Sequence, residues 1–175
     1  FVKGWNDSTL VEQHGKTTGV LHGWAPISGG YSIELAILWS NLGITPTAGM
    51  TLGFSVGYND DDNGAGREGQ AVWIGTANNW LDTSAFGNIV LGADMNLIAV
   101  PYTSTNLAVD GNVSESDWNI ATDVSKTVIG TTNNQTTFGV LWDTTYLYVG
   151  MKVMDDTLYN DSTYVHEDDS VEIYI

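Results

Sequence analysis

The chain has 175 residues, with 21 acidic against 5 basic side chains and a formal net charge of −16. Because nucleic acid phosphates and anionic lipid headgroups repel such a polyanion, neither nucleic acid nor a membrane is expected as a partner. A hydrophobic content of 42%, which includes 7 Trp, is enough for a folded core of about one ordinary domain and argues against global disorder.

Alternation of apolar and small or polar residues recurs along the chain. Ile33, Leu35 and Ile37 fall on one face of the first such segment, as in a half-buried strand. The short turn 143–145 separates two later segments and predicts a hairpin, whereas residues 40–43 suggest a single helical turn. The sequence therefore predicts an all-β fold, an antiparallel β-sandwich of jelly-roll type. The predicted strands are residues 31–39, 52–58, 138–142, 146–153 and 170–175.

A change in composition divides the chain into two blocks. Residues 93–105 contain Pro101 and a run of Thr and Ser, which predicts a linker between residues 1–92 and 106–175. Because a block of fewer than about 100 residues builds only a thin core, we expect each block to need the other or a partner chain.

Several motifs of these blocks belong to a known pattern. They are residues 106–111, 138–143 and 167–175 in the second block, and 30–37, 53–60 and 80–91 in the first. The second block resembles the amino-terminal half of a family-nine carbohydrate-binding module, and the first block resembles its carboxy-terminal half. The resemblance implies a non-catalytic β-sandwich of a secreted or cell-surface protein that binds plant-type polysaccharide or glycan ends.

The order of the two halves is permuted relative to that family. Three arrangements follow from the permuted order: a cut across tandem modules, a circular permutant, or a subunit whose halves pair with those of neighbouring chains. The third arrangement would let strands of a neighbouring chain complete the sandwich, and it gives an alternative function. The chain would then be the structural subunit of an extracellular fibre or surface layer, assembled by half-domain exchange.

The resemblance also implies a sugar site. Such modules hold a terminal sugar between two Trp rings, and Trp80 matches one of them, while His166 stands at the position of the other. Glu172 matches a sugar-contacting carboxylate, and Lys3 stands where the family has Arg. With Asn78 as a further hydrogen-bonding group beside the aromatic ring, these five side chains are the predicted carbohydrate site.

Acidic residues gather in two regions, one after the strand at 52–58 and one near the end of the chain. Calcium takes six to eight oxygen ligands, which carboxylates supply, and adjacent carboxylates repel one another unless a cation lies between them. The alternative is a solvated hairpin tip, since Asp, Asn and Gly also favour turns. The resemblance favours calcium, because the family carries it as a structural ion. The predicted ligands are Asp60, Asp61, Asp62, Asp155, Asp168 and Asp169.

The sequence gives little support to an enzyme. Glycoside hydrolysis needs two opposed carboxyl groups, and no acidic pair stands in a recognisable catalytic context. The three histidines, at positions 14, 22 and 166, share no spacing typical of a metal site or a catalytic triad. Cysteine is absent, which excludes thiol nucleophiles, zinc–thiolate sites and disulfides.

Overall fold

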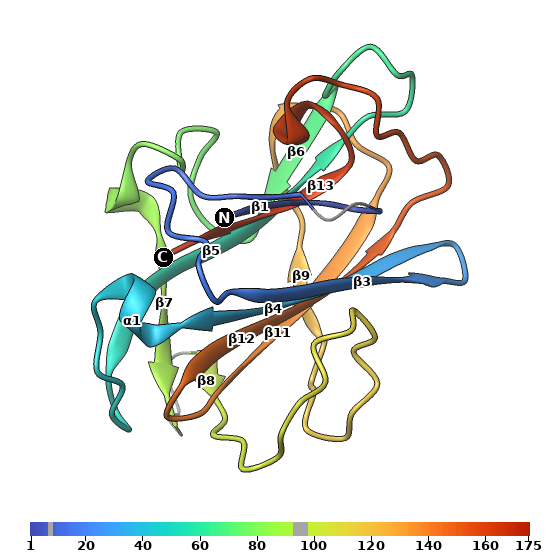
Figure 1. The fold of residues 1–175 in the computed structure, drawn as a ribbon. Coiled ribbons are helices and arrows are strands. Elements are labelled where there is room, and N and C mark those ends of the chain that lie inside the picture. Colours follow the sequence, from blue (N-terminus) through green and yellow to red (C-terminus); the bar gives the residue numbers. More distant parts are fainter. Residues whose placement is uncertain (7–8, 93–97) are drawn as a thin grey trace.

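The computed structural model describes residues 1–6, 9–92 and 98–175 and consists almost entirely of strands (Figure 1). Two single-turn 3₁₀ helices are labelled η1 and η2. The elements are β1 (Val2–Gly4), β2 (Leu10–Val11), β3 (Leu21–Ile27), β4 (Gly30–Leu38), α1 (Trp39–Leu42), β5 (Thr51–Asp60), β6 (Gly69–Val72), η1 (Thr83–Ala85), β7 (Gly87–Leu91), β8 (Ile98–Val100), β9 (Thr122–Val124), β10 (Lys126–Gly130), β11 (Gln135–Trp142), β12 (Tyr146–Met154), η2 (Val165–Glu167) and β13 (Ser170–Tyr174).

The strands form two sheets that pack face to face. The first sheet has the order β10-β6-β5-β13-β1-β2, with β7 paired to the other end of β5 and β8 paired to β7. The second sheet has the order β3-β4-β12-β11-β9. Apart from the parallel pair β7–β8, the pairs between these strands are antiparallel, and β11 and β12 form the predicted hairpin. The prediction of an antiparallel β-sandwich is confirmed.

The inner faces of β4 and β5 supply the centre of the core. Ile33 and Ile37 from β4 and Phe54 and Val56 from β5 are fully buried, as the alternation of the sequence predicts. Trp39 departs from the prediction, because the chain turns at the end of β4 and this residue begins α1 instead of ending the strand. Among the described residues, no helix is both long and apolar enough to cross a membrane.

The outer face of the second sheet is also covered, by the chain between β8 and β9. Glu34 lies on this face and is only 1% exposed. Its carboxylate accepts hydrogen bonds from the backbone N–H groups of Asp110 (3.1 Å) and Gly111 (2.9 Å) and from Trp118 Nε1 (3.1 Å). Gly111 has φ 90°, and a Cβ there would lie 2.2 Å from the backbone of Trp24, so only glycine fits at this contact.

The first and last strands of the chain are neighbours in one sheet. β1 pairs with β13 in antiparallel register, with Val2 opposite Glu172 and Lys3 opposite Val171. A strand of the same chain, β1, therefore lies between β13 and β2. The expectation that a neighbouring chain completes the sandwich by half-domain exchange is not supported.

Strands from the two predicted blocks are mixed within both sheets. In the first sheet, β5 and β6 of residues 1–92 lie between β10 and β13 of residues 106–175. Of the expected linker at 93–105, residues 98–100 form β8, and residues 93–97 lie outside the described residues. The division into half-modules stays a prediction about the sequence.

Candidate functional site

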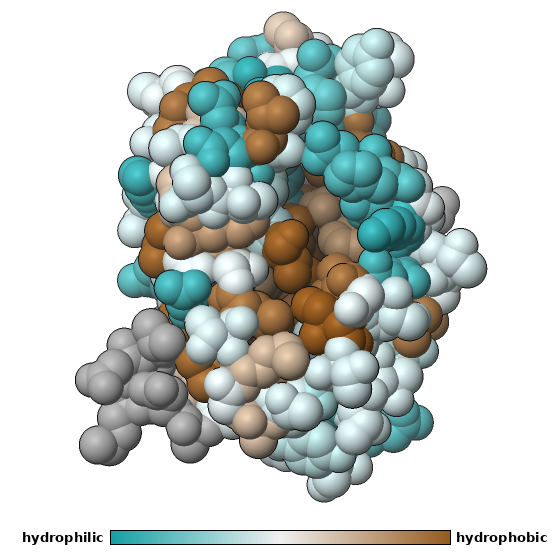
Figure 2. Space-filling model, turned by 90° about the vertical axis from the view of Figure 1, so that its left-hand side faces the viewer, coloured by the Kyte–Doolittle hydropathy of each residue, from teal (hydrophilic) through white to brown (hydrophobic). Residues whose placement is uncertain are grey.

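A groove with a volume of about 910 Å³ opens between β1, β13 and the turn that carries η1. Figure 2 shows the face on the left of Figure 1, which is hollowed at its centre, with hydrophobic residues in the hollow and hydrophilic residues along part of its rim. The groove is lined by Phe1, Val2, Val11, Glu12, Gln13, His14, Lys16, Asn41, Leu42, Arg67, Gln70, Ala77, Asn79, Trp80, Leu81, Thr83, Phe86, His166, Glu172, Ile173, Tyr174 and Ile175.

One wall of the groove presents an aromatic ring to solvent. Trp80 is 58% exposed, although the burial of so large a ring would normally stabilise a core. The turn that carries Trp80 is held by the buried side chain of Asn79. Its Oδ1 accepts the N–H of Thr76 (2.8 Å), and its Nδ2 donates to the carbonyl of Ile74 (3.0 Å). These hydrogen bonds fix the backbone of the turn, on which the ring of Trp80 is exposed. Asn78 precedes this pair and is exposed, but it does not line the groove.

The floor of the groove is formed by Arg67, Gln70 and Glu172, which a polar hydrogen-bonded network joins to the buried Asn59. Gln70 Nε2 donates to Glu172 Oε2 (2.8 Å) and to Asn59 Oδ1 (3.0 Å), and Arg67 Nη1 donates to the same Asn59 oxygen (3.0 Å). The Tyr174 hydroxyl also donates to Glu172 Oε2. Burial raises the pKa of Glu172, and the positive charge of Arg67 opposes this rise. The groove thus combines an apolar ring with buried donors and acceptors.

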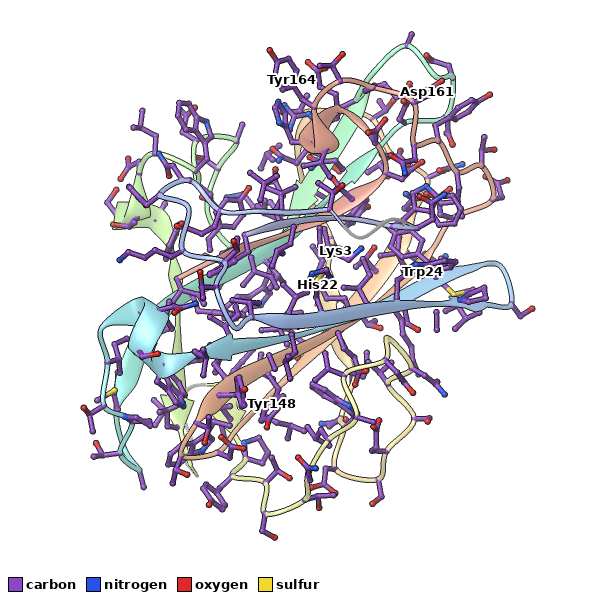
Figure 3. The ribbon with its side chains drawn as sticks, in the orientation of Figure 1. Lys3, His22, Trp24, Tyr148, Asp161 and Tyr164 are labelled. Carbon is purple, nitrogen blue, oxygen red and sulfur yellow. The ribbon has the colours of Figure 1, made fainter. Side chains whose placement is uncertain are left out.

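The wall formed by η2 carries a pair of stacked rings. His166 lines the groove and stacks on Tyr164, with ring centroids 5.7 Å apart and planes inclined by 26°. Tyr164 is 60% exposed, and Figure 3 shows it at the outer end of this loop. It was not among the predicted site residues. The position at which the resemblance implies a second Trp thus carries a histidine that stacks on a tyrosine.

Lys3 does not lie in the groove. Along β1 the side chains alternate, so that Val2 lines the groove while Lys3 points to the other side of the sheet. Lys3 is 1% exposed, its Nζ donates to the carbonyl of Gly4, and Figure 3 shows it in the interior. The groove therefore brings together three of the five predicted side chains, Trp80, Glu172 and His166.

The predicted metal ligands are divided between two clusters. In the first, called the Asp60 cluster, carboxylate oxygens of Asp60, Asp62 and Asp155 lie within 4.8 Å of one another. Asn134 Nδ2 donates to Asp60 and, at 2.9 Å, to Asp155. Asp60 Oδ2, Asp62 Oδ1 and Asn134 Oδ1 are buried, and the described residues offer them no hydrogen-bond partner. Burial, with the nearby charges of Asp62 and Asp155, raises the pKa of Asp60 to about 6.

In the second cluster, called the Asp61 cluster, carboxylate oxygens of Asp61, Asp161 and Asp168 lie within 4.8 Å of one another. Asp168 Oδ1 accepts the N–H groups of Asp161 (3.0 Å) and Ser162 (2.8 Å), and Asp61 Oδ1 accepts that of Gly64 (2.9 Å). The other oxygen of Asp61 is buried, without a hydrogen-bond partner among the described residues. Asp161 is exposed and was not predicted.

Asp169 belongs to neither cluster. Its Oδ1 accepts the N–H of Asp61 (3.1 Å), and its Oδ2 accepts that of Tyr159 (2.6 Å). Burial and the charge of Asp155 raise the pKa of Asp169 to about 8. This residue joins the loops that carry the clusters, and the other five predicted ligands lie in one cluster or the other.

The two clusters offer the same kind of donor. Both consist of carboxylates, without histidine, and their oxygens suit a hard divalent cation such as calcium. Burying a charged oxygen without a donor is unfavourable, and a cation among the three carboxylates would remove that cost. The clusters could therefore hold a metal ion.

The comparison with protein families identifies the family of the chain. The model of the family "Carbohydrate family 9 binding domain-like" matches residues 1–93 and 109–175. The chain belongs to this family. The match leaves out most of the segment that contains β8 and covers every side chain of the polar network and both carboxylate clusters.

This family 9 domain is also similar to parts of much longer proteins. It is 31% identical over 149 residues to "Endo-1,4-beta-xylanase A" of Thermoanaerobacterium saccharolyticum and to "Exoglucanase XynX" of Acetivibrio thermocellus. Each alignment covers 83% of the chain and only 12% and 13%, respectively, of those proteins. A shorter stretch of 66 residues is 41% identical to "Endo-1,4-beta-xylanase A" of Thermotoga maritima, over 37% of the chain and 6% of that protein. None of the solved structures matches the chain significantly.

Proposed function

We propose that this domain is a non-catalytic binding module of an extracellular protein and that it takes the ends of plant-type polysaccharide chains in its groove. The observation that carries the proposal is the exposed ring of Trp80 beside a floor of buried polar groups. A sugar ring has an apolar C–H face, which stacks on an aromatic side chain, and an edge of hydroxyl groups, which need donors and acceptors. The groove supplies both kinds of contact.

Each part of the groove has a role in this proposal. Trp80 stacks on one face of a sugar ring, and the His166–Tyr164 pair supports the other. Glu172 accepts a hydrogen bond from a sugar hydroxyl, and the guanidinium of Arg67 donates to sugar oxygens. Asn78 contributes from the rim next to Trp80, whereas the burial of Lys3 removes it from the proposed site.

The names of the relatives point to β-1,4-linked polymers. A xylanase and an exoglucanase act on chains of xylose and glucose, and this domain matches about an eighth of each protein. We propose xylan and cellulose fragments as its ligands. Since these polymers lie outside cells, the proposal includes a secreted or cell-surface protein.

Calcium is the proposed occupant of both carboxylate clusters. The buried oxygens without hydrogen-bond partners, Asp60 Oδ2 and Asp61 Oδ2, support this choice, because they lie among carboxylates from distant parts of the chain. A calcium ion in each cluster would bind the end of β5 to the loop between β12 and β13.

Calorimetric titration with xylo- and cello-oligosaccharides in the presence of calcium tests the sugar proposal. We expect saturable heat for the wild-type domain and a loss of about ten-fold in affinity for Trp80→Ala, since a stacked ring contributes roughly 1–1.5 kcal/mol. Tyr102→Ala is the matched control, because Tyr102 is an exposed aromatic residue that does not line the groove. Absence of heat at millimolar oligosaccharide, or equal affinity of the Trp80→Ala and wild-type domains, would refute the proposal.

A further inference from the structure

Two loops connect the groove with the Asp61 cluster. The loop 61–68 begins with Asp61 and carries Arg67 of the groove floor near its end. The loop 155–169 carries Asp161 and Asp168 of the cluster on either side of His166, which lines the groove. Figure 1 shows both loops at the top of the molecule, and Figure 3 places Asp161 and Tyr164 on the same loop.

The two loops touch one another along their length. Gly64 has φ 68°, and a Cβ there would lie 3.1 Å from Asp161 Oδ2 and 2.9 Å from the ring of Tyr159. A Cβ on Gly66 would lie 3.9 Å from the Cβ of Glu167. A displacement of one loop is therefore transmitted to the other through direct contacts.

Three carboxylates lie close together where the two loops meet. Asp61 is fully buried, its Oδ2 has no hydrogen-bond partner among the described residues, and the carboxylates of Asp161 and Asp168 lie within 4.8 Å. Three negative charges at this distance repel one another, most strongly where water is excluded. A divalent cation reverses the sign of the interaction and draws the loops together.

We infer that a divalent cation in the Asp61 cluster sets the position of Arg67 and His166, so that cation binding and carbohydrate binding are coupled. The inference rests on the proposed function of the groove. Without the cation, repulsion separates the loops, and the groove loses a donor from its floor and a ring from its wall. With the cation, both side chains are held before the sugar arrives, which removes an ordering cost from sugar binding.

Coupling of this kind acts in both directions. If calcium raises the affinity for a sugar, the sugar raises the affinity for calcium by the same factor, because binding free energies are linked. We expect a factor of about ten, within the usual range of roughly 5–150-fold for coupled sites.

Hydrogen exchange tests the cation's effect on the loops without any sugar. We compare the wild-type domain in calcium and in chelator, and expect slower exchange in calcium for residues 61–68 and 159–168. Residues 107–118, which Glu34 anchors on the far sheet, should not change. If each loop exchanged at the same rate in calcium and in chelator, the inference would be overturned.

Two matched variants assign the effect to one cluster. Asp161→Asn removes an exposed ligand of the Asp61 cluster, so we expect this variant to fold and to need more calcium for the same protection of the loops. Asp156→Asn makes the same charge change at another exposed position of the same loop, outside both clusters, and should behave as the wild type does. Equal calcium requirements of the two variants would contradict the assignment.

Oligosaccharide titration with and without calcium separates this inference from the proposed function. Binding that is about ten-fold tighter in calcium supports both. Binding of equal affinity in calcium and in chelator overturns the coupling and leaves the proposed function standing. If no oligosaccharide binds in either condition, the proposed function fails and with it the coupling to sugar.

Discussion

Two regions of the molecule bury carboxylates in different ways. On the outer face of the second sheet, Glu34 is buried but accepts three hydrogen bonds from the chain that covers it. At the end of β5, Asp60 and Asp61 are buried as deeply, yet each has one oxygen without a donor among the described residues. The difference shows that burial alone does not mark a cation site. The number of donors that the chain itself supplies separates Glu34, a self-sufficient carboxylate, from the cluster carboxylates, which could hold a cation.

The largest expected effect is that of removing calcium from the wild-type domain. A ligand at 100 times its dissociation constant stabilises the folded state by about 2.7 kcal/mol per site. In a chain of this size, each kcal/mol shifts the melting temperature by roughly 2–4 °C, so loss of both proposed sites should lower it by about 10–20 °C. Scanning calorimetry with and without chelator measures this. A melting temperature unmoved by chelator would remove the distinction between the two kinds of carboxylate.

The next effect concerns the self-sufficient carboxylate. Glu34→Ala leaves three donors without their acceptor, one of them buried and two partly buried, which should lower the free energy of unfolding by about 3 kcal/mol, equally in calcium and in chelator. Glu34→Gln retains one acceptor oxygen and should lower it less. Urea denaturation of both variants gives the values. If calcium restored the stability of the Glu34→Ala variant, Glu34 and the clusters would not be independent.

A substitution in the Asp60 cluster should change stability in opposite directions in chelator and in calcium. In chelator, Asp60→Asn removes a buried charge that faces two other carboxylates, so the variant should be about 1 kcal/mol more stable than the wild type. In calcium the same substitution removes a ligand and should destabilise the domain. Urea denaturation in both conditions measures the difference. The same sign in both conditions would contradict a cation site at this cluster.

The smallest effect is a pH dependence at Glu34. Burial raises the pKa of Glu34 in the folded state above its value in the unfolded chain. The folded state therefore holds the proton more strongly, and its stability falls as the pH rises from about 4.5 through the folded-state pKa. The melting temperature of Glu34→Gln relative to wild type should thus be higher at pH 7 than at pH 4. A constant difference would show that Glu34 does not titrate in this range.

Local patterns in the sequence predicted the parts of the molecule that depend on local structure. Alternation identified β4, β5 and the β11–β12 hairpin, because the pattern repeats every two residues whatever the strands pair with. The family resemblance predicted Trp80 and Glu172 for one site, and both line the same groove. At β1 the alternation was too short to use, since three residues do not tell which face Lys3 occupies.

The parts that were missed depend on pairing between distant segments. Gln70 joins the groove floor because β5 and β6 pair with Asn59 opposite Gln70. Asp161 joins the Asp61 cluster because its loop folds back against residues 61–68. Neither residue stands in a motif. The run Asp60-Asp61-Asp62 likewise did not reveal that Asp61 belongs to a different cluster from Asp60 and Asp62.

The number of residues at the end of β5 and the start of the following loop matters as much as their identity. Asn59 bonds within the groove floor, Asp60 and Asp62 belong to one cluster, and Asp61 belongs to the other. Side chains alternate along β5 as far as Asp60, and the loop begins at Asp61, so inserting or deleting one residue here would move each of these side chains away from its partners. Substitutions at these positions can alter one site at a time, whereas a change of length would disable the groove floor and both clusters together. Among related domains, we therefore expect variation in the identity of these residues but not in their number.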